Sequence, residues 1–411
     1  MDIIKMTDPR ERMRHDPPPP PAATAASAAA VASVFGSLDL FHEIILCLDV
    51  PADLVRAALV SKYWYRRVSD AVFLRRYRCR HPPRPLGCFA VSATHQSMRF
   101  VPMRRPSALA HIHDDFKASV GNDAILSVSD CRNGRLVVAT GRRHSGACKF
   151  AVFSPLHHAR GTPALRPLPP AALLERDHCF RHVLLPEQGG DGRSCTAVTV
   201  MFDDLHYSRA LVHVSELQAG AWGEERISNI KDLPRQWMRI SQVQFLLASG
   251  KIYILGMAGH VLCLSLRSMN LYCIRLPDGI YYSYRTNLMM SRPDAGSGFY
   301  LIHVKGFQLC VWLYSATTIK WKQVDTICLR QAFGHLAIAD SSSNWKTGPD
   351  VYLAAVGDNA EFVFLWIRRA LFCIRVATRA VEKVYEYEQY QQLETIHPLM
   401  TIWPVFPSLK D

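Results

Sequence analysis

A four-strand pattern that recurs near the end of the chain constrains the fold most. Its first clear copy runs from Gln244 to Leu276 and divides into QFLLA, KIYILG, HVLCLSL and NLYCIRL. Tyr253, Tyr300 and Tyr352 hold the same place in three successive copies, at a spacing of about 50 residues. A single four-stranded sheet cannot bury both of its faces, so repeats of this kind stack radially into a propeller.

Two looser copies of the pattern lie upstream, around GRLVVAT to KFAVFSP and around AVTVMF to AWGEERI. An Asn-Gly turn at Asn133-Gly134 predicts a tight hairpin in the first of these. Five units are therefore recognisable, and we expect six blades to close the ring. The missing strands would come from Leu86 to Arg99 or from Thr395 to Phe406. The alternative interpretation is an irregular β-sandwich.

The segment between residues 38 and 77 has a helical period instead. Leu38, Phe41, Ile44, Ile45 and Leu48 fall on one face of an amphipathic helix. Pro51 can open a second helix, because its missing N–H costs nothing at the first helical position. Ser61 is a suitable N-cap for a third helix that carries Trp64, Val68, Ala71 and Val72. The sequence thus predicts three short helices.

This helical segment resembles an F-box, the motif by which substrate receptors dock onto the adaptor of a ubiquitin ligase. The matching residues are Glu43-Ile44-Ile45, Asp53-Leu54, Leu59 to Trp64 (LVSKYW) and Phe73-Leu74-Arg75. Asp39 and the Asp49-Val50 insertion depart from the family pattern. The resemblance implies that seven residues hold or support the adaptor-facing surface: Leu38, Ile45, Leu48, Pro51, Leu54, Val60 and Trp64. The alternative is a generic helical hairpin that precedes a larger domain.

The repeat region resembles kelch-like propellers in its period, but the glycine pairs and tryptophans of kelch repeats are poorly reproduced. It is more similar to plant-type F-box-associated β domains, in which an Asp-Cys-x-Asn-Gly-Arg-Leu hairpin recurs. Asp130 to Leu136 matches this hairpin, and Ser154-Pro155-Leu156 matches the following strand end. Both resemblances imply a binding domain rather than a catalytic one.

The charge of the chain is concentrated in one stretch. The formal net charge is +13, and residues 56–84 contain nine basic residues and one acid. Basic patches can bind nucleic acid, although many are solvated helix faces. RNA binding through residues 56–84 is therefore the alternative function, while nucleic acid remains an unlikely partner. Twelve cysteines without a CxxC pair suit a reducing compartment, which predicts a cytoplasmic or nuclear location and no disulfide framework.

Several clusters with possible chemistry are better interpreted as loops. The ligand-rich run from His111 to Asp115 lacks a converging third or fourth ligand, and the same holds for His157-His158. Gly189 to Gly192 lacks the strand and helix that a phosphate loop requires. Tyr281 to Arg285 could line a recognition face, whereas the Tyr385, Tyr387 and Tyr390 series lies among acids. We expect no catalytic residues, no metal, no cofactor and no membrane span, and the substrate-binding residues stay unknown.

The sequence therefore predicts an α+β chain with a three-helix F-box followed by an all-β, propeller-like domain of four-stranded repeats. The expected boundaries are a disordered Pro/Ala-rich leader (1–35), the F-box (36–80), a linker (81–120) and the substrate-recognition domain (121–411). The implied function is that of a non-catalytic substrate receptor in a Skp–cullin–F-box ubiquitin ligase. Its partners would be a Skp-type adaptor, cullin through that adaptor, and a protein target.

Overall fold

The computed structural model forms two compact units, residues 1–82 with 403–411 and residues 83–402. The residues it describes are 36–81, 84–92, 97–103, 112, 116, 124–141, 149–156, 165–170, 179–187, 194–202, 209–231, 233, 243–257, 259–280, 287–293, 296–334, 351–367, 369–386, 395–401 and 406. The predicted leader, both histidine clusters apart from Ile112, the Gly189 to Gly192 run and Tyr281 to Arg285 lie outside them.

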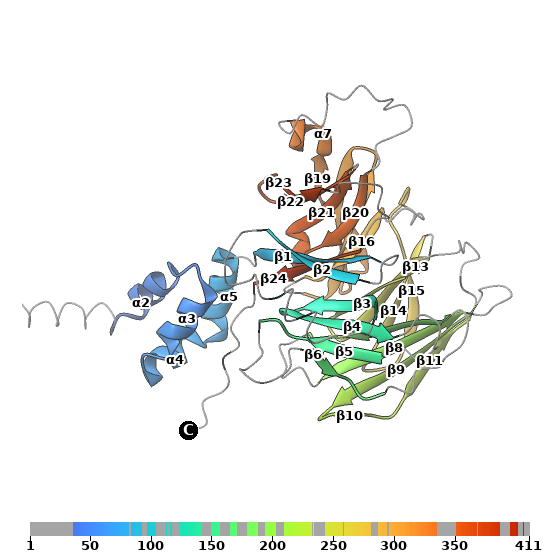
Figure 1. Ribbon diagram of the computed structural model, residues 1–411, viewed down its shortest axis with the longest axis horizontal. Coiled ribbons are helices and arrows are strands. Elements are labelled where there is room, and N and C mark those ends of the chain that lie inside the picture. The colour runs from blue at the N-terminus through green and yellow to red at the C-terminus, as the bar shows by residue number, and fades with distance from the viewer. Residues whose placement is uncertain are drawn as a thin grey trace, which may run out of the picture. The chain divides into compact units, whose positions relative to one another are not determined.

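The first unit contains helices α2 (Leu38–Ile45), α3 (Pro51–Ala58), α4 (Lys62–Val68) and α5 (Ala71–Arg80), labelled in Figure 1. The prediction that a single third helix carries both Trp64 and Val72 is wrong, because α4 ends at Val68 and α5 begins at Ala71. The Asp70 carboxylate accepts hydrogen bonds from Val72 N (2.9 Å) and Phe73 N (3.0 Å) and so starts a new helix. Ser61 caps α4, as predicted, by accepting from Trp64 N at 3.1 Å.

The helices of this unit share a small aromatic core. Phe41 and Tyr77 are completely buried, and the Trp64 ring meets the Phe41 ring edge-on at 5.0 Å. Phe406, from the far end of the sequence, packs edge-on against Tyr65 with 5.6 Å between ring centroids. The remaining buried members are Ile45, Leu46, Leu54, Ala58, Val68 and Phe73. No helix in the described ranges is long and apolar enough to cross a bilayer.

The second unit contains six antiparallel sheets. The first two hold β3 (Ala124–Arg132), β4 (Arg135–Gly141), β5 (Lys149–Phe153) and β6 (Leu165–Pro167), then β7 (Cys179–Leu184), β8 (Cys195–Phe202), β9 (Ala210–Gln218), β10 (Ala221–Trp222) and β11 (Arg226–Ile230). The third and fourth hold β12 (Gln244–Ala248), β13 (Lys251–Met257), β14 (His260–Ser265) and β15 (Leu271–Arg275), then β16 (Leu288–Ser291), β17 (Gly298–Lys305), β18 (Gln308–Ser315) and β19 (Lys320–Cys328).

Helix α7 (Leu329–Ala332) follows β19. The fifth sheet holds β20 (Val351–Val356), β21 (Phe362–Ile367), β22 (Ala370–Arg375) and β23 (Val381–Glu386), with the short 3₁₀ helix η4 (Asp358–Ala360) between its first two strands. The sixth sheet joins the two ends of the unit in the order β2-β1-β24, with β1 (Pro85–Ser92), β2 (Ser97–Pro102) and β24 (Thr395–Met400).

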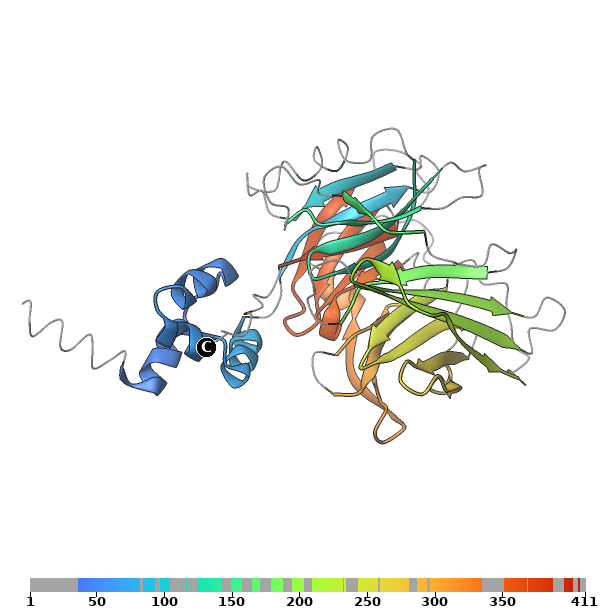
Figure 2. The same ribbon diagram turned by 90° about the horizontal axis from the view of Figure 1, so that it is seen from below.

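The six sheets close into a ring, and Figure 2 shows them standing next to one another like blades. One edge strand from each sheet contacts those of its two neighbours, in the cyclic order β24, β3, β7, β12, β16, β20 and back to β24. A separate cluster of buried apolar side chains fills each of the six junctions between neighbouring sheets. These contacts confirm a propeller of six blades and exclude the sandwich alternative.

The range predicted as a linker, 81–120, is partly wrong. It contains β1 and β2, which pair with each other, while β1 also pairs with β24. The β1 sequence PLGCFAVS lacks the alternation of a half-exposed strand because neighbouring blades cover both of its faces. The suggestion that residues 86–99 or 395–406 complete the ring is confirmed, since both segments contribute strands to one blade.

Candidate functional site

The helical unit exposes an unusual share of large apolar side chains for its size. Most of the large apolar side chains that are exposed among the described residues lie in this unit: Leu38, Leu40, Ile44, Val50, Leu59, Val60, Tyr63 and Val72. Leu59 and Val60 are 72% and 65% exposed, directly after α3. Leu40 and Ile44 are one helical turn apart on α2, away from Phe41 and Ile45. Exposed apolar side chains gathered on one small unit are typical of a protein-binding surface.

The seven residues predicted to hold or support an adaptor-facing surface differ in how far they are buried. Leu38 and Val60 are exposed, whereas Ile45 and Leu54 are buried in the core of the unit. The other three, Leu48, Pro51 and Trp64, are partly buried. The buried pair can only support such a surface from behind.

The sequence reasoning missed Leu40, Ile44, Leu59 and Tyr63 as candidate contact residues. Their signal was present in the sequence. Leu40 and Ile44 form an apolar i, i+4 pair on α2, although the predicted apolar face of that helix includes Leu38 and Ile44, which the structure leaves 38% and 41% exposed.

The basic stretch 56–84 is partly neutralised by local ion pairs. Arg56 pairs with Asp53 at 2.6 Å, and Glu43 accepts from Arg76 at 2.8 Å. Arg80 also lies 3.6 Å from the Glu43 carboxylate. The four arginines of α5 nevertheless share that helix with no acid. Four of the nine basic residues of the segment therefore lie on α5, and two of these, Arg76 and Arg80, share the Glu43 carboxylate.

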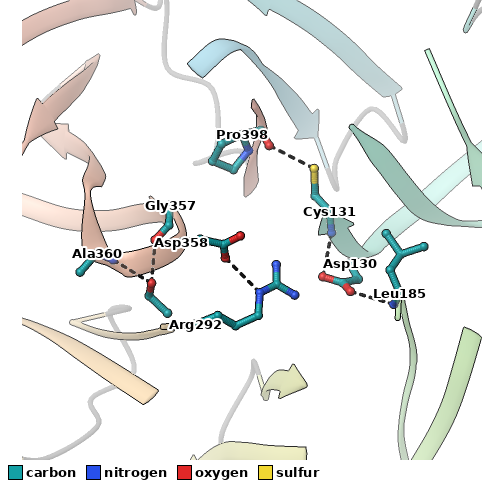
Figure 3. A network of polar contacts seen from close by, with 9 residues as sticks. Asp130, Cys131, Leu185, Arg292, Gly357, Asp358, Ala360 and Pro398 are labelled. Atoms are coloured by element: carbon teal, nitrogen blue, oxygen red, sulfur yellow. Dashed lines mark hydrogen bonds and ion pairs between the residues drawn. The ribbon is translucent and has the colours of Figure 1, made fainter. Parts of the chain in front are cut away.

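In the propeller, Asp130 and Cys131 fasten the first blade to both of its neighbours (Figure 3). The Asp130 carboxylate accepts from its neighbour Cys131 N and, through its second oxygen, from Leu185 N, both at 2.9 Å. Leu185 follows β7 in the second blade. The Cys131 thiol donates to Pro398 O of β24, in the sixth blade, at 3.1 Å. The Asp-Cys pair of the predicted hairpin is thus an inter-blade fastening.

A second set of contacts joins the fourth and fifth blades, at and just after the ends of β16 and β20. Arg292 Nε lies 3.0 Å from Asp358 Oδ1. The Ser291 hydroxyl donates to Gly357 O at 2.6 Å and accepts from Ala360 N at 3.0 Å. Burial opposes the charge on Arg292, but Asp358 and Asp130 outweigh it and raise the pKa of the guanidinium. Arg292 therefore stays charged and links the fourth and fifth blades through Asp358.

Arg132 lies near Arg292, one residue before the Asn133-Gly134 turn. The tight hairpin predicted here from the sequence has positive φ at both turn residues, 49° and 67°, as a type I′ turn requires. Burial and the neighbouring Arg292 lower the pKa of Arg132 to about 10. Within the described residues, no group of three or more His, Cys, Asp or Glu side chains could hold a metal ion.

Comparison with solved structures gives only weak likenesses. Dihydro-heme d1 dehydrogenase NirN in complex with DHE is 13% identical, with a TM-score of 0.29 over 67% of this chain, and this chain covers 48% of its length. Oligogalacturonate lyase in complex with manganese is 8% identical, with a TM-score of 0.31 over 62% of this chain and 75% of that one. Scores this low carry no argument about function.

A family model gives the informative match. No curated protein matches the chain. The family model described as "F-box protein AT5G49610-like, beta-propeller" matches residues 127–406, which span all the blades except the β1 and β2 strands and the start of β3. The chain therefore belongs to the F-box protein AT5G49610-like beta-propeller family.

Proposed function

We propose that this chain is a substrate-receptor subunit of a Skp–cullin–F-box ubiquitin ligase. The observation that carries the proposal is a small helical unit with many exposed apolar side chains, in the same chain as a propeller of an F-box protein family. In this proposal the helical unit is an F-box that docks the Skp-type adaptor, and the propeller binds the target protein.

Such a subunit supplies proximity and makes no covalent intermediate. Holding a target near the charged ubiquitin-conjugating enzyme raises the effective concentration of the target's lysines. The charged groups at the centre of the propeller fit this role, because Asp130 and Arg292 use their hydrogen bonds to join blades. We also propose that the chain acts in the cytoplasm or the nucleus, the compartments in which a receptor of a cullin-based ligase would meet its partners.

The exposed residues after α3 allow a direct test of docking. Changing Leu48, Pro51 and Leu54 to charged residues is unsuitable, because Leu54 is fully buried and its replacement would unfold the unit. We therefore choose the double variant Leu59→Asp/Val60→Asp, since both side chains are exposed. Apolar anchors dominate the energy of interfaces of this type. We expect co-elution with a Skp-type adaptor in size-exclusion chromatography to be lost.

The matched control is Ile319→Asp/Val324→Asp, which changes two exposed apolar residues of the propeller, 76% and 50% exposed. This control should retain the adaptor. Undiminished adaptor binding by a folded Leu59→Asp/Val60→Asp variant would contradict docking through this part of the helical unit.

A further inference from the structure

A shallow groove of about 520 Å³ runs along one side of α5. Its lining comes from the end of α2 and from α5: Leu46, Val72, Arg75, Arg76, Cys79 and Arg80. The five α5 residues follow one face of the helix, at i, i+3, i+4, i+7 and i+8. The opposite face carries Phe73 and Tyr77 into the core of the unit. The groove is therefore the outward face of a helix whose inner face is anchored.

The arginines of this groove carry more charge than their neighbours neutralise. Arg76 and Arg80 share a single carboxylate, that of Glu43, which is itself about half exposed. Arg75 forms no ion pair with any residue in the described ranges. Three guanidinium groups thus face one carboxylate along about 7.5 Å of helix.

The groove also offers apolar contact between its charges. Val72 is 56% exposed at one end, and Leu46, only 2% exposed, closes the base. The aliphatic stems of the arginines add to this surface. No lining residue is aromatic, so the groove provides no face on which a nucleic-acid base can stack. This combination favours an amphipathic, acidic polypeptide over RNA.

We propose that this groove binds an acidic segment of a partner protein. Asp and Glu carboxylates of the segment pair with Arg75, Arg76 and Arg80, since guanidinium forks match carboxylates in a two-pronged geometry. One apolar side chain of the segment rests on Val72. The surface is distinct from the residues that follow α3, so this proposal does not depend on adaptor docking.

The test measures binding of a fluorescein-labelled 12-residue peptide of Glu and Asp with one central Leu to the full chain, by fluorescence anisotropy. Arg75→Glu/Arg80→Glu places two acids in the groove and should weaken binding at least ten-fold. Arg56→Glu/Lys62→Glu makes the same change in net charge at exposed residues outside the groove and should change binding less than three-fold. Equal losses in the two variants would show a non-specific charge effect and overturn the proposal.

Two further arms separate the possible ligands. A peptide with Gln and Asn in place of Glu and Asp should not bind, and one with Ser in place of the Leu should bind several-fold more weakly. Displacement of the acidic peptide by single-stranded poly(U) RNA at lower concentration than by unlabelled peptide would assign the groove to RNA instead.

The milder variant Arg75→Gln/Arg80→Gln guards against misfolding. It removes charge without adding any, and should give an intermediate loss of peptide binding with unchanged helical circular dichroism. Adaptor co-elution should persist in both groove variants. Wild-type peptide binding by the folded Gln variant would refute the proposed arginine contacts.

Discussion

At the scale of single residues, Asp130 shows how one carboxylate can hold a ring together. It satisfies two backbone N–H groups, one from its own strand end and one from the next blade, and it lies near the charge of Arg292. The resemblance to F-box-associated β domains singled out this residue as part of a hairpin signature. Only the structure reveals that it also accepts from the backbone N–H of Leu185, 55 positions away.

We expect Asp130→Ala to destabilise the propeller by about 2–3 kcal/mol, because it leaves the backbone N–H groups of Cys131 and Leu185 without their acceptor. Urea unfolding followed by tryptophan fluorescence measures this loss. Asp278→Ala is the control, since among the described residues Asp278 pairs with Arg275 in an exposed contact. If both variants unfold at the same urea concentration, Asp130 does not join the blades energetically.

At the scale of elements, the break between α4 and α5 follows from capping chemistry. The spacing of Trp64, Val68, Ala71 and Val72 predicts one helix that continues across the break. Asp70 stops this by offering its carboxylate to the N–H groups of Val72 and Phe73. An aspartate in a helical stretch competes with the backbone for hydrogen bonds and so favours a helix start.

We expect Asp70→Ala to weaken α5 by about 1 kcal/mol, because the first-turn N–H groups lose their acceptor. Hydrogen–deuterium exchange of the α5 amides should then be about five-fold faster. Asp70→Asn keeps an acceptor oxygen and should exchange nearly like the wild type. Unchanged exchange in the alanine variant would mean that tertiary packing, and not the cap, holds the start of α5.

The strands show what sequence can and cannot provide. The tyrosine repeat and the Asn133-Gly134 turn predicted the blades, because a buried sheet repeats its alternation and its turn residues locally. The sequence predicts a linker where β1 and β2 lie, because β24, which pairs with β1 and completes their blade, is about 300 residues away in sequence. The exposure of Leu59 against the burial of Leu54 also depends on packing between helices, which the periodicity of one helix does not determine.

At the scale of the whole propeller, closure depends on pairing β1 with β24. Arg84 and Thr401 extend this pairing by two further hydrogen bonds, Arg84 N to Thr401 Oγ1 and Thr401 N to Arg84 O, both at 2.9 Å. Ile396 and Leu399 are buried in the two clusters that flank the sixth blade. Removal of β24 therefore opens two junctions of the ring at once.

We expect a chain that ends at residue 394 to lose the cooperative thermal unfolding of the propeller and to be digested rapidly by trypsin. A chain that ends at residue 402 keeps β24 and should retain both properties in the propeller. Circular dichroism at increasing temperature and limited proteolysis measure the difference. Equal cooperativity in the two truncated chains would show that five blades suffice.

The pairing of β1 with β24 also determines when the ring can close during synthesis. β24 is made roughly 300 residues after β2, which at about 5–20 residues per second takes on the order of 15–60 seconds. The nascent β1–β2 hairpin must wait through this interval with an unpaired edge, an arrangement open to aggregation. The helical segment, by contrast, leaves the ribosome before any blade exists, so an early-binding partner could meet this chain long before its ring is closed.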